Sequence, residues 1–172
     1  GASRVYAIDS GSHQLAPALR KDARVINIEK CNARYLTPDV LGEEFIAHGG
    51  ADIIVMDVSF ISPTYIPPIL ASHLRPGGQA VTLIKPQFEV GREGLGKGGI
   101  VRENRFRRMA VARVLEGAAV VGLVRLRVMR SPIEGGDGNV EYLVLFGLAS
   151  ETNIRPLTVE QLPTGLFAYK TT

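Results

Sequence analysis

The stretch Ile53–Ser62 constrains the fold more than any other part of the sequence. Four consecutive apolar residues, Ile53-Ile54-Val55-Met56, are followed at once by Asp57. Such a β-branched run favours a strand that is covered on both faces, as in a parallel sheet. A second strand of similar composition, predicted over 80–84, ends in Lys85. Ligands bind at the carboxyl ends of strands in open α/β sheets, so Asp57 and Lys85 are the first candidates for function.

Strands and helices alternate along the rest of the chain. The sequence predicts further strands over 4–8, 23–28, 123–129 and 140–146, and helices over 11–20, 38–50, 62–75 and 104–119. This alternation predicts an α/β fold with a doubly wound, mostly parallel sheet. Only the turn-rich segment 131–139 joins the last two strands, so we expect the final strand to be antiparallel.

Composition excludes several classes of protein. With 172 residues, of which 45% are hydrophobic and 22% charged, the chain can bury a full core as one globular domain. The single cysteine, Cys31, excludes an internal disulfide, and the three histidines lack metal-ligand spacing, so we expect no metal. No apolar run is long enough to span a membrane. These features favour a reducing, cytoplasmic setting and no membrane partner.

Glu141 joins Asp57 and Lys85 in a candidate catalytic site. It lies near the start of the final strand, and an antiparallel strand starts at the edge where its neighbours end. An acid, an amine and a second acid would then surround one crevice. A lysine flanked by carboxylates is usually a structural ion pair. Its place at the ligand edge favours chemistry, although a base role for Lys85 needs a further cation or strong desolvation.

Asp9, Ser10 and Gly11 follow the first predicted strand and form a second candidate site. An acid at a strand end, followed by glycine, can accept hydrogen bonds from the ribose hydroxyls of a nucleoside. An equally good interpretation is that Asp9 and Ser10 cap the helix predicted over 11–20.

A glycine-rich segment over 87–99 precedes the helix predicted over 104–119. It resembles a P-loop by chance, because Gly98 stands where that motif needs Ser or Thr and no strand leads directly into it. We interpret it as a mobile loop that places three side chains to meet phosphates, and a solvated basic loop is as good an interpretation. The three side chains are Arg92, Lys97 and Arg102. The polar face of the helix holds Arg105, Arg107, Arg108 and Arg113.

Seven segments, in the same order, resemble the hemolysin A (TlyA) family, whose catalytic domain is similar to the FtsJ-like ribose 2′-O-methyltransferases. The segments are Val5–Asp9, Asn32–Leu36, Met56–Ser62, Leu83–Glu89, Gly96–Arg102, Ser131–Ile133 and Gly138–Tyr142. The resemblance implies a Rossmann-like methyltransferase sheet. It also implies methyl transfer from S-adenosylmethionine to a ribose 2′-hydroxyl, typically of cytidine, with ribosomal RNA or a ribosomal subunit as partner.

The resemblance further implies roles for individual residues. Asp57, Lys85 and Glu141 match the last three members of a Lys-Asp-Lys-Glu tetrad, in which Lys85 would accept the hydroxyl proton and the two acids would orient it. Within the cofactor site, Asp9 with Ser10 and Gly11 would hold the ribose. Asn32 with Ala33 would border the adenine. The residues implied in cofactor binding are Asp9, Ser10, Gly11, Asn32, Ala33, Asp57 and Val58.

Part of the family pattern has no match in the chain. The first lysine of the tetrad, the first strand with its glycine-rich loop and a small RNA-binding domain would all lie upstream of Gly1. We therefore expect residues 1–149 to be a partial methyltransferase domain that lacks a central strand and binds cofactor poorly alone. Residues 150–172 are predicted to be an extended tail. Alternative functions are a catalytically inactive RNA-binding protein of the same fold and a hemolysin that acts indirectly.

Overall fold

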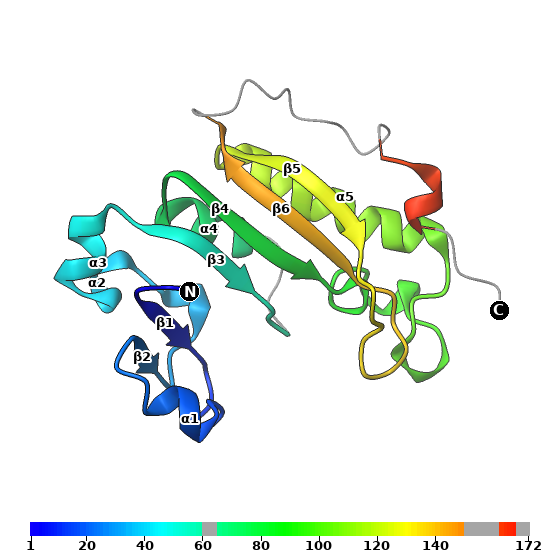
Figure 1. Cartoon of the computed structure of the whole chain (residues 1–172). Coiled ribbons are helices and arrows are strands. Elements are labelled where there is room, and N and C mark those ends of the chain that lie inside the picture. The colour runs from blue at the N-terminus through cyan, green and yellow to red at the C-terminus, as the bar shows by residue number, and fades with distance from the viewer. Residues whose placement is uncertain (60–64, 150–161, 168–172) are drawn as a thin grey trace.

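The computed structural model describes residues 1–59, 65–149 and 162–167, with strands and helices in alternation (Figure 1). The strands are β1 (Val5–Ile8), β2 (Val25–Ile28), β3 (Ala51–Met56), β4 (Leu74–Ile84), β5 (Leu123–Arg130) and β6 (Tyr142–Leu148). The α-helices are α1 (Pro17–Arg20), α2 (Pro38–Leu41), α3 (Glu43–His48), α4 (Ile66–His73) and α5 (Asn104–Val120). Short 3-10 helices are η1 (Ala33–Tyr35), η2 (Pro86–Phe88), η3 (Arg92–Gly94), η4 (Lys97–Gly99) and η7 (Thr164–Phe167). The predicted α/β class is confirmed.

The strands form two sheets. β1 and β2 pair in parallel, and a four-stranded sheet has the order β3-β4-β6-β5. β3 and β4 are parallel, whereas β6 is antiparallel to both β4 and β5. The sheet is therefore mixed, and the predicted antiparallel final strand is confirmed.

Among the described residues, β1 and β3 each pair with only one neighbouring strand. β1 is at the edge of the small sheet, and β3 is at the edge of the large one. The absence of a central strand, which the family resemblance implies, stays a prediction. β3 was expected to be covered on both faces, yet Ile53 and Val55 are 69% and 77% exposed, whereas Ile54 and Met56 pack against the core.

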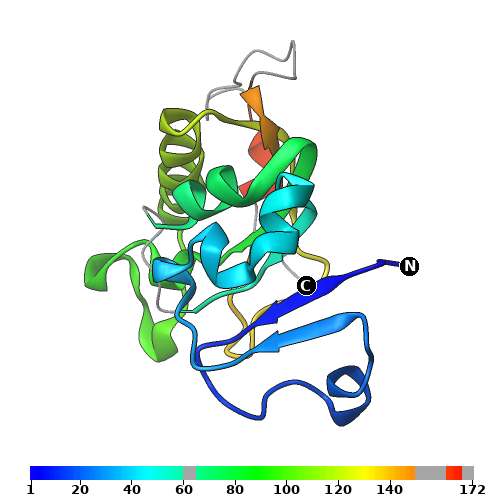
Figure 2. The same ribbon diagram turned by 90° about the vertical axis from the view of Figure 1, so that its left-hand side faces the viewer.

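The main core lies between the large sheet and two helices, α4 and α5, which occupy the same side of it (Figures 1 and 2). Its members come from alternate positions of β4 and β6, as the two-residue period of a strand requires, and from one stripe of each helix. They include Ile66, Leu70, Ala80, Ile84, Val111, Val114, Tyr142, Val144 and Phe146. None of the described helices combines the length and apolar character that a membrane crossing needs.

Three elements differ from the prediction because of their glycines and prolines. The helix predicted over 38–50 is split into α2 and α3 by Gly42, whose φ of 90° no helix residue adopts. The helix predicted over 11–20 is reduced to α1. β4 begins at Leu74, so Pro76-Gly77-Gly78 interrupts the strand pairing rather than ending a helix, and the register with β3 shifts there. Residues 60–62, the end of the stretch Ile53–Ser62, lie outside the described residues.

The part of the predicted tail that the structure describes packs against the core. Leu162 is 2% and Phe167 is 3% exposed, and the Phe167 ring lies 5.4 Å from that of Tyr142. For Thr164–Phe167, the extended conformation that the sequence predicted is replaced by the short helix η7. For the tail residues that lie outside the described ranges, the extended form stays a prediction.

Candidate active site

Asp57 and Lys85 meet at the carboxyl ends of neighbouring parallel strands. Asp57 directly follows β3, Lys85 directly follows β4, and Lys85 Nζ lies 2.7 Å from Asp57 Oδ1. Lys85 Nζ also donates a hydrogen bond to Ser59 Oγ at 3.2 Å. The Lys85 side chain is 16% exposed and that of Asp57 is 61% exposed, so solvent reaches the pair mainly from the side of Asp57. The predicted proximity of the two residues is confirmed.

Glu141 lies on the adjacent strand, directly before β6. Ile84 pairs with Tyr142 across β4 and β6, so Lys85 and Glu141 occupy the next positions along the same two strands. Glu141 is 6% exposed. Its Oε1 accepts a hydrogen bond from Gln87 Nε2 at 3.3 Å, and among the described residues no ion pair joins it to Lys85. The strand register thus brings Glu141 to the same edge, and its partner there is Gln87.

Asp9 forms a turn at the carboxyl end of β1. Its Oδ1 accepts a hydrogen bond from the Gly11 amide at 2.6 Å, and its backbone oxygen accepts one from Cys31 after β2. A Cβ on Gly11 would lie 3.1 Å from Asp9 Oδ1, so this tight turn favours glycine. The alternative that Asp9 caps a helix is wrong, because α1 begins after Ala16 and has no side-chain cap.

A cavity of about 200 Å³ lies next to this turn and is lined by Ala7, Ile8, Asp9, Gln14, Leu15, Asn27 and Glu29. Of the predicted cofactor residues, only Asp9 lines it. The Asp9 carboxylate is exposed, so it can accept hydrogen bonds from a ligand. Ligand sites usually have about 300–1,000 Å³, so this cavity is smaller than a usual ligand site. Among the described residues, no three acidic, cysteine or histidine side chains are grouped to hold a metal.

The other predicted cofactor residues have different surroundings. Asn32 Oδ1 accepts a hydrogen bond from the Arg34 amide and so caps η1, which includes Ala33. Ser10 is exposed next to the Asp9 turn. Val58 is partly buried and packs against the main core. Cofactor binding by these residues stays a prediction.

The three predicted RNA-binding residues are exposed on a segment that is tied to the protein. Arg92 lies in η3, Lys97 in η4, and Arg102 shortly before α5. Asn139, which is 1% exposed, accepts a hydrogen bond from the Val101 amide at 2.9 Å and donates one to Gly99 O at 3.1 Å. These two hydrogen bonds attach the end of the glycine-rich segment to a buried side chain, and the mobility expected from the glycines stays a prediction.

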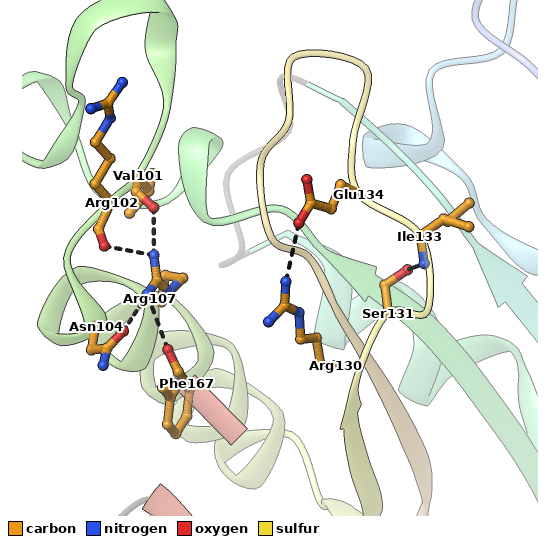
Figure 3. Close-up of polar contacts among 9 residues, drawn as sticks. All are labelled: Val101, Arg102, Asn104, Arg107, Arg130, Ser131, Ile133, Glu134 and Phe167. Carbon is orange, nitrogen blue, oxygen red and sulfur yellow. Dashed lines mark hydrogen bonds and ion pairs between the residues drawn. The ribbon is translucent and has the colours of Figure 1, made fainter. Parts of the chain in front are cut away.

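Arg107 was predicted on the polar face of its helix, and this prediction is wrong. The side chain is fully buried and donates hydrogen bonds to Val101 O at 2.7 Å, Arg102 O at 2.8 Å and Phe167 O at 3.0 Å, and also to Asn104 Oδ1 (Figure 3). Figure 3 shows the Arg102 side chain pointing away from this cluster. Residues 92–102, which carry Arg92, Lys97 and Arg102, form a basic segment. Arg107 therefore holds the backbone at the end of the basic segment, while the Arg102 side chain points outward.

Glu89, four residues after Lys85, is a buried acid that sequence reasoning did not single out. It is 8% exposed, and its Oε2 has no hydrogen-bond partner in the described part of the chain. Burial raises the pKa of this carboxyl to about 7, and the nearby charge of Arg113 opposes the rise. Arg113 donates to the backbone oxygen of Glu89 at 2.5 Å.

Sequence reasoning also missed Ser59 and Gln87, the partners of Lys85 and Glu141. Ser59 lies two residues after Asp57, and alternate residues of an extended chain point to the same side. That spacing could have identified Ser59. Gln87 follows Lys85 by two residues but lies in η2, so no strand period indicates where its side chain points.

Comparison with known proteins identifies the family. Residues 1–148 match the FtsJ-like methyltransferases. Bacillus subtilis YqxC is 43% identical over 144 residues, which are 84% of this chain and 50% of YqxC. The 16S/23S rRNA (cytidine-2′-O)-methyltransferase TlyA of Mycobacterium tuberculosis is 41% identical over 144 residues, which are 84% of this chain and 52% of TlyA.

A solved structure from Streptococcus thermophilus, which carries the name hemolysin, is similar in fold. It has a TM-score of 0.83 and 38% identity, over 97% of this chain and 57% of its own. The chain spans about half the length of the two curated relatives. Since the family match covers all the described strands and five helices, this chain belongs to the FtsJ-like methyltransferase family.

Proposed function

We propose that the chain carries the catalytic centre of an S-adenosylmethionine-dependent methyltransferase that acts on ribose 2′-hydroxyls of ribosomal RNA, cytidine in particular. The observation that carries this proposal is the Lys85–Asp57 ion pair of 2.7 Å at the carboxyl ends of β3 and β4, with Glu141 at the next register position. The site is at the edge where open α/β sheets bind ligands. The name of the relative TlyA supports the choice of cytidine.

Lys85 is the group that meets the reacting hydroxyl. In its neutral amine form Lys85 can donate its two N–H groups to Asp57 and Ser59, so that its lone pair remains to accept a hydrogen bond from the 2′-hydroxyl. Lys85 then accepts the hydroxyl proton as the oxygen attacks, and Asp57 stabilises the resulting charge. Most of the rate acceleration comes from alignment of the two reactants, which can supply about 7–11 kcal/mol in favourable cases.

The residues around Asp9 fit the nucleoside half of the cofactor. The exposed Asp9 carboxylate can accept hydrogen bonds from two adjacent ribose hydroxyls, and Asn32 and Ala33 after β2 lie at the same sheet edge. S-adenosylmethionine, when bound, supplies the methyl group on an electrophilic sulfonium. The exposed cations Arg92, Lys97 and Arg102 would contact RNA phosphates and set the orientation of the target strand.

The first test is calorimetric titration of S-adenosylmethionine into this 172-residue chain and into the full-length gene product. Binding by the full-length protein is the expected result, with weaker binding by the chain alone. Transfer of a labelled methyl group to ribosomal subunits is then measured for the wild type, Lys85→Met and the exposed control Lys21→Met. We expect Lys85→Met alone to lose transfer and to keep cofactor binding.

Two results would contradict this proposal. Cofactor binding without methyl transfer to any ribosomal subunit would leave a catalytically inactive RNA-binding protein of the same fold. Full activity of Lys85→Met would remove Lys85 from the mechanism. A membrane role is not proposed, and leakage of liposomes on addition of the protein is the result that would reinstate it.

A further inference from the structure

Gln87 contacts a proposed catalytic carboxylate and has no role in the mechanism so far. Its Nε2 donates a hydrogen bond to Glu141 Oε1 at 3.3 Å. It lies in η2, two residues after Lys85, so one short turn carries both side chains. We propose that Gln87 is a positioning residue that holds Glu141 for methyl transfer, and this inference rests on the proposed function.

Glu141 is confined at the same oxygen by a second contact. A Cβ on Gly135 would lie 2.6 Å from Glu141 Oε1, so the backbone of the 131–139 turn lies directly against the carboxylate. The turn itself is closed by Ser131 N, which donates to Glu141 O at 2.8 Å. The Gln87 hydrogen bond therefore orients Oε1, and the close approach of the turn at Gly135 limits the space into which this oxygen can move.

An amide suits this position because it is a neutral donor. A lysine or arginine would neutralise Glu141 and compete with Lys85, whereas the Gln87 amide orients the carboxylate and leaves its charge intact. The other end of the amide, Gln87 Oε1, is buried and has no hydrogen-bond partner among the described residues.

The test compares Gln87→Met, which keeps the shape and removes the donor, with Gln87→Glu, which places a second carboxylate beside Glu141. Gln79→Glu is the matched control, because Gln79 is an exposed glutamine in the middle of β4, away from the strand end that carries Lys85. We expect Gln87→Met to lower kcat roughly ten- to a hundredfold, the range for a lost hydrogen bond to a charged group, with KM for S-adenosylmethionine unchanged. Gln87→Glu should move the acidic limb of the pH–rate profile upward by about one unit or more.

A second readout does not depend on activity. The carbon-13 resonance of the Glu141 carboxyl in the 172-residue chain should move in Gln87→Met and stay at its wild-type position in Gln79→Glu. An unchanged Glu141 resonance in Gln87→Met would overturn the inference, as would a wild-type kcat and pH profile for that variant. Absence of methyl transfer by the wild type would instead contradict the proposed function, while the Glu141 resonance still decides the contact.

Discussion

Replacing Glu89 with glutamine should change how the stability of the protein depends on pH. Glu89 lies between the site residue Lys85 and the basic segment, and only 8% of it is exposed. Burial raises the pKa of its carboxyl from 4.5 to about 7, with a smaller opposing effect of the Arg113 charge. The folded protein therefore keeps a proton on Glu89 at pH values where the unfolded chain has already released it.

The sign and size of the effect follow from that difference. Between pH 4.5 and about 7 the folded state binds more protons, so the free energy of unfolding falls as the pH rises. The pKa difference is about 2.5 units, and at about 1.4 kcal/mol per unit the wild type loses about 3 kcal/mol across this window. Glutamine cannot ionise, so the Glu89→Gln variant should escape this loss.

Urea unfolding, followed by circular dichroism in a series of buffers from about pH 4.5 to 8.5, measures the effect directly. The quantity of interest is the stability of Glu89→Gln minus that of the wild type, which should rise by about 3 kcal/mol across the series. Glu116→Gln, an exposed position on α5, is the control and should show a flat difference. A flat difference for Glu89→Gln as well would mean that Glu89 is ionised in the folded protein, and the reasoning would be refuted.

Three further substitutions test the surroundings of the site. Arg107→Met should lower the free energy of unfolding by about 3 kcal/mol or more, measured by urea unfolding, because several buried acceptors lose their donor. Gly135→Ala should lower methyl transfer roughly a hundredfold, the cost of a 1 Å misplacement of Glu141, whereas Gly136→Ala, which has open space, should not. Arg102→Ala should weaken RNA binding equally for different sequences. It should also reduce the slope of the logarithm of the binding constant against the logarithm of the salt concentration by about one.

The Asp57–Lys85 pair could be predicted because it follows from local patterns alone. Each residue ends a β-branched run, and consecutive strands of an α/β sheet commonly lie side by side, so their ends meet. Glu141 required one more step, the direction of the last strand, and the short turn between β5 and β6 supplied it. These inferences need only strand ends and connection lengths, both of which are visible in the sequence.

Coverage of the strands could not be predicted in the same way. The apolar run of β3 indicates a strand with two buried faces, but Ile53 and Val55 are exposed beside an edge that has no partner. An apolar run shows that both faces of a strand can be buried. It does not show which strand or helix lies next to it. The burial of Arg107 was missed for a related reason, since its acceptors come from the turn before the helix and from Phe167, sixty residues away.

Asn139 connects the two halves of the proposed site, and this connection explains why the glycine-rich segment and the 131–139 turn belong together. Its side chain bonds Gly99 and Val101 of the basic segment, and its backbone oxygen accepts a hydrogen bond from Gly135, next to the Glu141 carboxylate. Side-chain and backbone hydrogen bonds of one buried residue thus link the segment that we propose to contact RNA to the turn beside Glu141, the proposed catalytic acid.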